Sequence, residues 1–297
     1  MTSHEAALHA DETIQSRSRH IRRRLTAAVI VAGALAIATM ASAQRIMVAP
    51  GRMMRVPPKW AKAEDFDGSF MYCRGFYTSV VREAGGMGWW TDYPAADNNF
   101  SVRLMELTYT HIQLDAERQP NTVVVRLTDP LLYKCPILFM EDTGTLRFTN
   151  REVQSLHDYF MKGGFLYVDD FWGSAAWERW ELEIGRVLPP SEFPIFDIPP
   201  EHPIMHSLYE VKEVPQVSAI TFWQRDGGST SERGADSPHA NFRGIADDHG
   251  RLMVVMTHNT DIADTWEREG EDKEYFKRFS PAGYALGVNI VLYAMTH

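Results

Sequence analysis

The chain offers little to a nucleic acid, a nucleotide or a zinc ion. Cys73 and Cys135 are the only cysteines in 297 residues, and their spacing matches no zinc or redox motif. No glycine-rich loop ends in Lys-Ser or Lys-Thr, so the phosphate-binding signature of nucleotide-binding proteins is missing. The formal net charge is −9, and no basic run follows residue 24. Such a chain is repelled by phosphate backbones, which argues against nucleic acid as a partner.

Long apolar runs are also scarce, and the one that stands out covers residues 25–40. Arginines precede it, and Ala41-Ser42-Ala43 after it has the small-x-small pattern that signal peptidase cleaves. We therefore predict a signal peptide over residues 1–43 and export to the periplasm or the extracellular space. The alternative is an uncleaved anchor, although the run is shorter than the roughly 20 residues of a spanning helix. Arg22-Arg23-Arg24-Leu25 loosely fits a twin-arginine signal, so the export route stays open.

Removal of residues 1–43 would take away five basic and three acidic side chains and move the formal net charge from −9 to −11. No second long apolar run follows, so we expect a soluble mature body without a membrane span. Its expected partners are a small molecule, an envelope polymer or an envelope protein. Both cysteines remain after cleavage. In an oxidising compartment they could pair, and the alternative, two separate buried thiols, stays open.

The mature chain divides into an irregular N-terminal arm, residues 44–65, and one α/β domain, residues 66–297. A Pro-rich and then Gly/Ser-rich excursion at about 189–250 is expected to hold short strands at most. A segment rich in Gly, Trp and Asp, residues 82–99, is expected to be a loop. The apolar runs predict strands at 70–74, 122–127, 136–140, 165–169 and 251–257, and helices at 149–162, 174–187 and from Ser280-Pro281 to the end.

The order of elements between residues 136 and 169 predicts parallel strands. Thr149 and Glu152 form a capping box that opens a helix, and Gly163 ends it. A strand precedes this helix and another follows it, which makes a βαβ unit with a right-handed crossover. We therefore predict a three-layer α/β fold, a mostly parallel sheet with helices on both faces.

Polar residues follow the strand ends. The run 165–169 is almost continuously apolar, as in strands buried on both faces, and leads into Asp169 and Asp170. Carboxyl ends of parallel strands meet at one edge of a sheet, where α/β proteins bind their ligands. For any single aspartate the alternative is a capping or turn role, and His258 could instead bond a backbone carbonyl. The residues expected at this edge are Asp129, Glu141, Asp142, Asp169, Asp170, His258, Asn259 and Asp261.

The aromatic loop 82–99 adds candidates for the wall of a binding site. We include its Asp92 and Asp97 among the ligand-binding candidates. Trp172, with Trp89 and Trp90, would supply stacking surfaces for a sugar or peptide if these rings are exposed.

Several separate motifs then occur in a characteristic order. They are Trp90-Thr91-Asp92-Tyr93-Pro94-Ala95-Ala96-Asp97, Leu127-Thr128-Asp129-Pro130, the stretch 163–173, Glu201-His202-Pro203-Ile204 and His258-Asn259-Thr260-Asp261. Together they resemble the bacterial domain-of-unknown-function family 4159, from roughly residue 70 to the end. The family itself resembles the class I glutamine amidotransferase-like folds and the trehalose-utilisation-type proteins. The resemblance implies a flavodoxin-like sheet and, by analogy, places His202 near the site, but it implies no established activity.

One departure from the amidotransferases bears on function. Their nucleophilic cysteine lies on the turn after the strand that corresponds to residues 165–169, where this chain has Asp170-Phe171-Trp172-Gly173. Glutaminase activity is therefore not expected, because a thiol must lie on that turn beside a base.

Two functions remain open. The first is a non-catalytic ligand-binding or scaffold domain of the envelope. The alternative is a metal-assisted hydrolase that acts on a carbohydrate or peptide. It would use Asp169, Asp170, His202, His258 and Asp261, with a divalent metal held by Asp170, His202 and His258. No cofactor is firmly implied.

Overall fold

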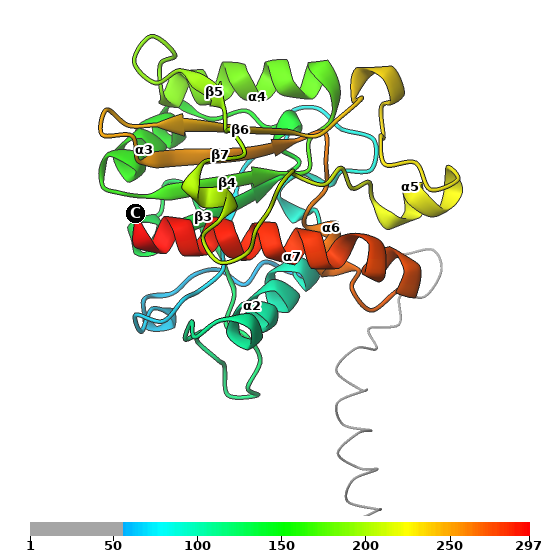
Figure 1. Cartoon of the computed structure of the whole chain (residues 1–297). Helices are drawn as coiled ribbons and strands as arrows, with labels where there is room; N and C mark the ends of the chain where they lie inside the picture. Colours follow the sequence, from blue (N-terminus) through cyan, green and yellow to red (C-terminus); the bar gives the residue numbers. More distant parts are fainter. Residues whose placement is uncertain (1–55) are drawn as a thin grey trace, which may run out of the picture. The chain divides into compact units, whose positions relative to one another are not determined.

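A computed structural model describes residues 56–297, which form a mixed α/β domain around a seven-stranded sheet (Figure 1). The predicted signal peptide and residues 44–55 of the predicted arm lie outside the described residues. The strands are β1 Cys73–Phe76, β2 Val123–Arg126, β3 Ile137–Glu141, β4 Phe165–Asp169, β5 Ile195–Asp197, β6 Asn241–Ala246 and β7 Leu252–His258. The helices are α2 Ala95–Leu107, α3 Asn150–Met161, α4 Gly173–Val187, α5 Ile220–Arg225, α6 Asp264–Glu267 and α7 Lys273–Thr296.

The sheet is mostly parallel, as predicted. Its strand order is β2-β1-β3-β4-β7-β6-β5. The pairs from β2 to β7 are parallel, whereas β6 and β5 add an antiparallel end. The β3–β4 register ends with Glu141 opposite Asp169, so two carboxyl groups lie side by side where these strands end. The carboxyl edge of the sheet is therefore acidic from the register alone.

The two faces of the sheet contribute to two separate core clusters. In β4, Phe165 and Tyr167 enter one cluster, and Leu166 and Val168 enter the other, as the alternation of strand side chains requires. Helices α2, α6 and α7 pack in the first cluster, and α3 and α4 pack in the second (Figure 1). Each large apolar side chain buried in this way stabilises the fold by about 1.5–3 kcal/mol.

Helix α3 begins as predicted, but α7 does not. The capping box of α3 is present, with Thr149 Oγ1 accepting from the N–H of Glu152. The prediction that Ser280-Pro281 caps the last helix is wrong. Asp272 caps α7 by accepting the N–H groups of Glu274 and Tyr275, and Pro281 lies inside the helix. The Ser280 hydroxyl instead donates to the backbone carbonyl of Thr265 in α6.

Three other boundaries differ from the predictions. The first strand begins at Cys73 rather than at Phe70, because β2 and β3 supply parallel partners only from Cys73 onward. The loop predicted over 82–99 ends early, since α2 already begins at Ala95. The excursion at 189–250 holds a short helix, α5, besides β5 and β6.

No helix among residues 56–297 is long and apolar enough to cross a bilayer.

Part of the predicted N-terminal arm pairs with the outer edge of β2. The N–H of Val124 donates to the Lys59 carbonyl over 2.8 Å, and the N–H of Ala61 donates back to Val124 over 2.9 Å. Trp60 thereby forms an isolated parallel bridge with Val124. The guanidinium group of Arg126 lies 3.6 Å from the centre of the Trp60 ring, a cation–π contact that holds the segment in place.

The two cysteines form a disulfide, one of the two alternatives left open by the sequence. Cys73 begins β1 and Cys135 directly precedes β3, with 6.0 Å between their Cα atoms. Both residues are fully buried. The disulfide therefore ties the entrances of two neighbouring strands together.

We expect reduction of this disulfide to destabilise the protein. The bond closes a separation of 62 residues, and constraint of the unfolded chain by a loop of that size is worth about 4 kcal/mol in the chain-entropy account, with measured values of about 2–4 kcal/mol. The free energy of unfolding, measured in urea with and without dithiothreitol, should fall by such an amount.

The double variant Cys73→Ala/Cys135→Ala is the control for this measurement. It should resemble the reduced protein and no longer respond to dithiothreitol. A wild-type protein that gains two titratable thiols without losing stability would contradict the expectation.

Candidate functional site

The candidate site lies at the carboxyl edge of the sheet, where the chain turns from β4 into α4. Asp169 ends β4 and is fully buried, accepting from Thr257 Oγ1 at 2.5 Å and from the N–H of Ala263 at 2.8 Å. Burial raises the pKa of Asp169 to about 7, although these hydrogen bonds oppose the rise. Both carboxyl oxygens of Asp169 accept hydrogen bonds from the protein, so this residue stabilises the carboxyl edge.

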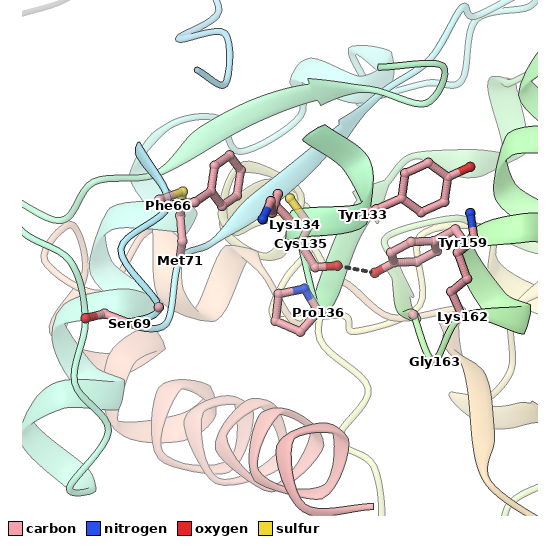
Figure 2. Close-up of a pocket in the computed structure, with 12 residues that line it drawn as sticks. Phe66, Ser69, Met71, Tyr133, Lys134, Cys135, Pro136, Tyr159, Lys162 and Gly163 are labelled. Atoms are coloured by element: carbon pink, nitrogen blue, oxygen red, sulfur yellow. Dashed lines mark hydrogen bonds between the residues drawn. The ribbon is translucent and has the colours of Figure 1, made fainter. Parts of the chain in front are cut away.

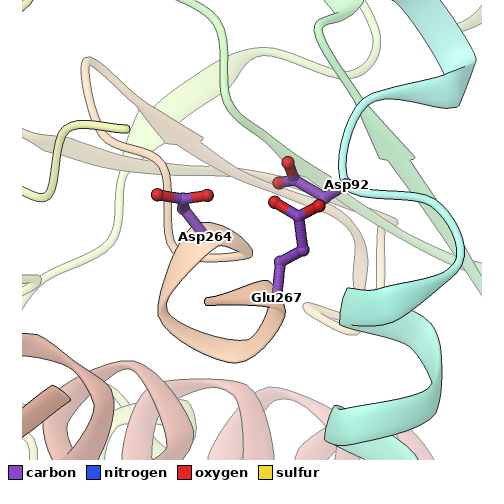
Figure 3. A group of neighbouring side chains, drawn as sticks. All are labelled: Asp92, Asp264 and Glu267. Carbon is purple, nitrogen blue, oxygen red and sulfur yellow. The ribbon is translucent and has the colours of Figure 1, made fainter. Parts of the chain in front are cut away.

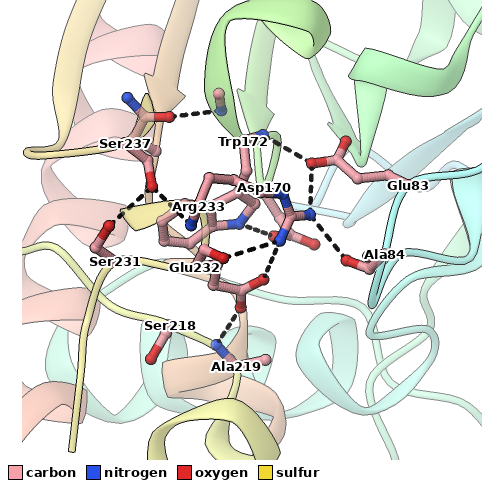
Figure 4. Close-up of polar contacts among 12 residues, drawn as sticks. Glu83, Ala84, Asp170, Trp172, Ser218, Ala219, Ser231, Glu232, Arg233 and Ser237 are labelled. Atoms are coloured by element: carbon pink, nitrogen blue, oxygen red, sulfur yellow. Dashed lines mark hydrogen bonds and ion pairs between the residues drawn. The ribbon is translucent and has the colours of Figure 1, made fainter. Parts of the chain in front are cut away.

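Asp170 lies on the sharp turn itself. Its φ of 51° is in the left-handed region, and only 8% of its surface is exposed. Oδ1 accepts from Trp172 Nε1 at 2.9 Å, as Figure 4 shows. Burial and then the nearby carboxylates of Glu232 and Asp142 raise the pKa of Asp170 well above its ordinary value. A carboxyl group therefore stands where the amidotransferase resemblance would place a thiol.

Charged side chains from two distant segments, residues 83 and 232–233, lie over this turn (Figure 4). Glu83 Oε1 accepts from the N–H of Trp172 at 3.0 Å and from Arg233 Nη2 at 3.1 Å. Arg233 also lies 3.3 Å from Oε2 of Glu232. Burial raises the pKa of both glutamates, which face each other across a single guanidinium group. Loops from either half of the chain thus cover Asp170.

Asp142 lies beside this network at the end of β3. Its φ is 49°, and Oδ2 accepts from the N–H of Gly88 at 2.6 Å, whereas Oδ1 has no partner. A side chain at Gly86 would not fit, because its Cβ would lie 2.3 Å from Oδ2 of Asp142. Burial, followed by repulsion from Glu83, raises the pKa of Asp142 to about 8. The aromatic loop is therefore folded down onto a buried carboxyl group.

Three further carboxyl groups converge below the loop (Figure 3). Each of Asp92, Asp264 and Glu267 offers an oxygen, and these oxygens lie within 4.8 Å of one another. Asp264 Oδ2 accepts from the N–H of Ile220 at 2.6 Å and from the hydroxyl of Tyr275 at 3.0 Å. Burial, followed by repulsion from Glu267, raises the pKa of Asp92 well above its ordinary value. Burial and repulsion from Asp264 raise the pKa of Glu267 to about 7, although Arg268 and a hydrogen bond with Asp92 oppose the rise. Among residues 56–297, this is the group with the spacing of metal ligands.

Asp261 joins these carboxyl groups to Asp170. Its Oδ1 accepts from the N–H of Asp264 at 2.8 Å, and burial followed by repulsion from Asp170 and Asp92 raises its pKa well above the ordinary value. The convergence of acids that the strand ends predicted is thus present in the structure.

Asp97, another ligand-binding candidate, has a structural partner. It forms an ion pair with Arg74, which also lies 2.7 Å from Glu141 Oε2, and both pairs are buried. Arg74 Nη1 further donates to the Thr91 carbonyl at 2.9 Å. One guanidinium group therefore compensates two carboxylates and fixes the loop before α2.

His258 and Asn259 are also engaged by the protein. Since the Gly173 carbonyl can only accept, His258 Nε2–H donates to it at 3.0 Å, and Nδ1 faces the Asn241 amide at 3.3 Å. Burial lowers the pKa of His258 to about 4, so the ring is neutral. Asn259 Oδ1 accepts the N–H of Gly173 at 2.8 Å. Both side chains hold the start of α4.

Two candidates lie apart from the acidic group. His202 caps the short 3₁₀ helix Pro203–Met205, and its ring lies 5.5 Å from Tyr293 near the end of α7. Asp129 caps the 3₁₀ helix Pro130–Lys134 by accepting the N–H of Leu131 at 2.9 Å. The capping alternative is therefore the observed one for Asp129.

The tryptophans do not form the predicted exposed surface. Trp172 and Trp90 are 4% and 8% exposed, and Trp89 is half-buried against Phe76 and Tyr93. Trp172 is fixed by its bond to Asp170. Stacking by Trp90 and Trp172 on an exposed wall was a wrong expectation, because the aromatic loop packs inward over its charges.

A cavity of about 540 Å³ lies at the opposite edge of the sheet (Figure 2). It is lined near the entrances of β3 and β4 by Pro136, Gly163 and Gly164, together with Tyr133 and Lys162. The Lys162 ammonium group lies 4.1 Å from the centre of the Tyr133 ring. Its lining includes Lys134 and Lys162 but no carboxyl side chain, so this cavity is separate from the acidic group at the carboxyl edge.

Sequence reasoning missed several members of the acidic group. Glu83 and Glu232 come from loops, and Asp264 and Glu267 belong to a one-turn helix. The sequence offered only the spacing of Asp264 and Glu267, which places two acids on one face of a helical turn.

Fold and site together define a mixed α/β domain with buried carboxyl groups at the carboxyl edge of a mostly parallel sheet. Residues 79–295 match the family described as Domain of unknown function (DUF4159), and the chain belongs to this family. No curated protein matches the chain.

We expect Arg74→Met to be strongly destabilising. The substitution leaves Asp97 and Glu141 buried without their counterion, a change that costs about 3–5 kcal/mol in other proteins. Urea unfolding should show this loss. The triple variant Arg74→Met/Asp97→Asn/Glu141→Gln should recover most of it, and a triple variant no more stable than the single one would contradict this account.

Stability should fall as the pH rises from 7 to 8.5. The folded protein retains protons on Asp142, whose pKa is about 8, and partly on Asp169, whose pKa is about 7, whereas the unfolded chain has lost them. The stability that these protons provide is therefore lost as the pH passes the folded pKa values. Over this range Asp142 should cost about 1 kcal/mol, and Asp169 less than half of that.

Urea unfolding in the presence of a chelator measures this dependence. Asp142→Asn should reduce it and leave the smaller contribution of Asp169, while Glu178→Gln, a change at an exposed carboxyl of α4, should leave it as in the wild type. A stability that rises over this interval in the wild type would contradict the prediction.

Proposed function

We propose that this protein is an exported, non-catalytic ligand-binding or scaffold domain of the cell envelope. The observation that carries the proposal is the absence of a nucleophilic thiol from the described chain. Cys73 and Cys135 are joined in a disulfide, and the turn after β4 carries Asp170. Amide hydrolysis by the amidotransferase route needs a cysteine on that turn with a base beside it.

The strand order supports an amidotransferase-like, three-layer flavodoxin-like fold. Reading only the parallel strands, β2-β1-β3-β4-β7 is the 2-1-3-4-5 order of flavodoxin-like sheets. In such sheets a ligand binds outside the carboxyl ends of β1 and β3. Here the aromatic loop and Asp142 occupy that position.

The disulfide also supports export. Disulfides persist in oxidising compartments such as the bacterial periplasm. A buried disulfide inside a domain preceded by residues with the pattern of a signal peptide fits that location. We propose a small molecule, an envelope polymer or an envelope protein as the partner.

The state of the histidine at the edge supports a non-catalytic role. His258 has both ring nitrogens engaged and a pKa of about 4, whereas a general base works best with a pKa near the operating pH. Asp170 is bonded to Trp172 and covered by the loop of Glu83. These groups hold the edge together instead of facing a substrate.

The second candidate function is a metal-assisted hydrolase, favoured by the many carboxyl oxygens at this edge. It would hold a divalent metal with Asp170, His202 and His258 and use Asp169 and Asp261 beside it. His202, beside the end of α7, would have to move toward Asp170, and His258 would have to release its present partners. For this reason we prefer the binding function.

The test is turnover by the protein purified after expression of the full chain. Glutamine, nitrophenyl esters, nitrophenyl glycosides and peptidoglycan serve as substrates, with and without added Zn²⁺ or Mn²⁺. We expect no hydrolysis above that of an Asp170→Asn variant, because both cysteines are held in a disulfide and both ring nitrogens of His258 are engaged.

Hydrolysis by the wild type that Asp170→Asn abolishes, with unchanged circular dichroism, would refute the binding function. Loss of that activity on chelation would establish the metal-assisted alternative.

A further inference from the structure

Two segments far apart in sequence bring three carboxyl groups together beneath the aromatic loop. Asp92 belongs to the turn before α2, and Asp264 and Glu267 lie on α6. The two segments are in contact, since Asn99 Nδ2 of α2 donates to the Trp266 carbonyl at 2.8 Å. Figure 3 shows the carboxyl group of Asp92 pointing toward that of Glu267. Three oxygens, one from each residue, lie within 4.8 Å of one another.

Asp92 has an oxygen that the protein itself leaves without a partner. Its Oδ2 is buried and makes no hydrogen bond, and only 7% of the residue is exposed. The backbone of Asp92 is in the left-handed conformation, with φ 61°. Within the described residues, a proton shared with the Glu267 carboxyl group would serve this oxygen. When both groups are ionised, the buried acceptor has no donor, which is costly, and a bound cation would supply the partner.

Arg268, the neighbouring cation, neutralises only part of the negative charge of the three carboxylates. Arg268 Nε lies 2.6 Å from Glu267 Oε2 and 3.3 Å from Asp264 Oδ1, and its Nη1 lies 2.8 Å from Glu271. It pairs with three carboxylates and has no ion pair with Asp92 in the described part of the chain. The charged groups that act on Asp92 most strongly are all acidic: Glu267, Glu141, Asp264 and Asp170.

We propose that Asp92, Asp264 and Glu267 bind one divalent cation, and that Ca²⁺ is the ion that fits best. The ligand set consists of oxygens alone, which suits hard cations and disfavours zinc and copper. Ca–O distances are about 2.3–2.6 Å, so two oxygens on opposite sides of the ion are about 5 Å apart. The observed spacing meets this limit. Mg²⁺ prefers near-octahedral geometry, keeps several of its waters and usually takes only one or two carboxylates, so a buried set of three carboxylates suits it less well.

Such an ion would join the turn before α2 to α6. It would supply the missing partner of Asp92 and neutralise the repulsion among the three carboxylates. The site is independent of the proposed function, since it uses neither Asp170 nor the cysteines, and a scaffold or an enzyme could hold it equally well.

The test is titration of the protein, expressed as the full chain and freed of metal by chelation, with CaCl₂ alone. Isothermal titration calorimetry should give one Ca²⁺ per chain. At a hundredfold excess over its Kd, Ca²⁺ should raise the melting temperature by about 5–10 °C, because it binds the folded state. MgCl₂ should bind more weakly.

Asp92→Asn and Glu267→Gln should each weaken Ca²⁺ binding at least about tenfold, because affinity follows the number of charged ligands. The control, Glu106→Gln, removes an exposed carboxyl of α2 and should leave binding unchanged. Asparagine tolerates a left-handed backbone, so Asp92→Asn should fold. Without metal it should melt at or above the wild-type temperature, since it removes one of three facing carboxylates.

The proposal is overturned if the wild type binds none of Ca²⁺, Mg²⁺ and Mn²⁺, or if Asp92→Asn binds Ca²⁺ as the wild type does. It is also overturned if Asp92→Asn folds but melts well below the metal-free wild type, which would make Asp92 a structural acceptor. If Glu267→Gln fails to fold, Asp92→Asn alone decides. Turnover of a substrate does not enter these outcomes, so failure here is distinct from failure of the binding function.

Discussion

Burial of many carboxyl groups at one edge of the sheet is the constraint on which the rest of the structure depends. The register of β3 and β4 already places Glu141 beside Asp169, and loops bring further acids to the same edge. Buried carboxylates are costly unless they are paired, hydrogen-bonded or protonated. Arg74, Arg233 and Arg268 each share their charge among two or three acids.

Backbone N–H groups donate hydrogen bonds to other buried carboxyl groups, and this explains why the loops fold over the carboxyl edge. Gly88 donates its N–H to Asp142, and Ile220 donates its N–H to Asp264. The first donor belongs to the aromatic loop and the second begins α5 in the Pro/Gly-rich excursion. The aromatic loop, which we expected to form an exposed binding wall, is therefore held inward by Asp142. A similar bond, from the Trp172 indole N–H to Asp170, holds the Trp172 ring against the edge, where it is not free to stack on a ligand.

Local signals in the sequence predicted local structure well. The capping box placed the start of α3, and the apolar run of β4 gave that strand its observed bounds. The mostly parallel sheet followed from the βαβ order. The strand ends predicted at which edge of the sheet the acidic group lies, but not all the residues that form it. Glu83, for example, contacts Trp172 and Arg233, which are far from it in the sequence. The sequence also did not show whether the two cysteines form a disulfide or remain separate thiols. Their spacing in the sequence does not reveal that their Cα atoms lie 6.0 Å apart in the fold.

The segment around Trp60 has a consequence for behaviour at high concentration. An exposed edge strand is a template on which another chain can add a strand, the first step toward aggregation. At one end of this sheet β2 has its Val124 amide and carbonyl already bonded to residues 59–61, with Arg126 over the Trp60 ring. At the other end β5 has only three residues, and its Asp197 pairs with Arg243. Both borders of the sheet are thus poor templates, which protects the domain against strand-by-strand self-association.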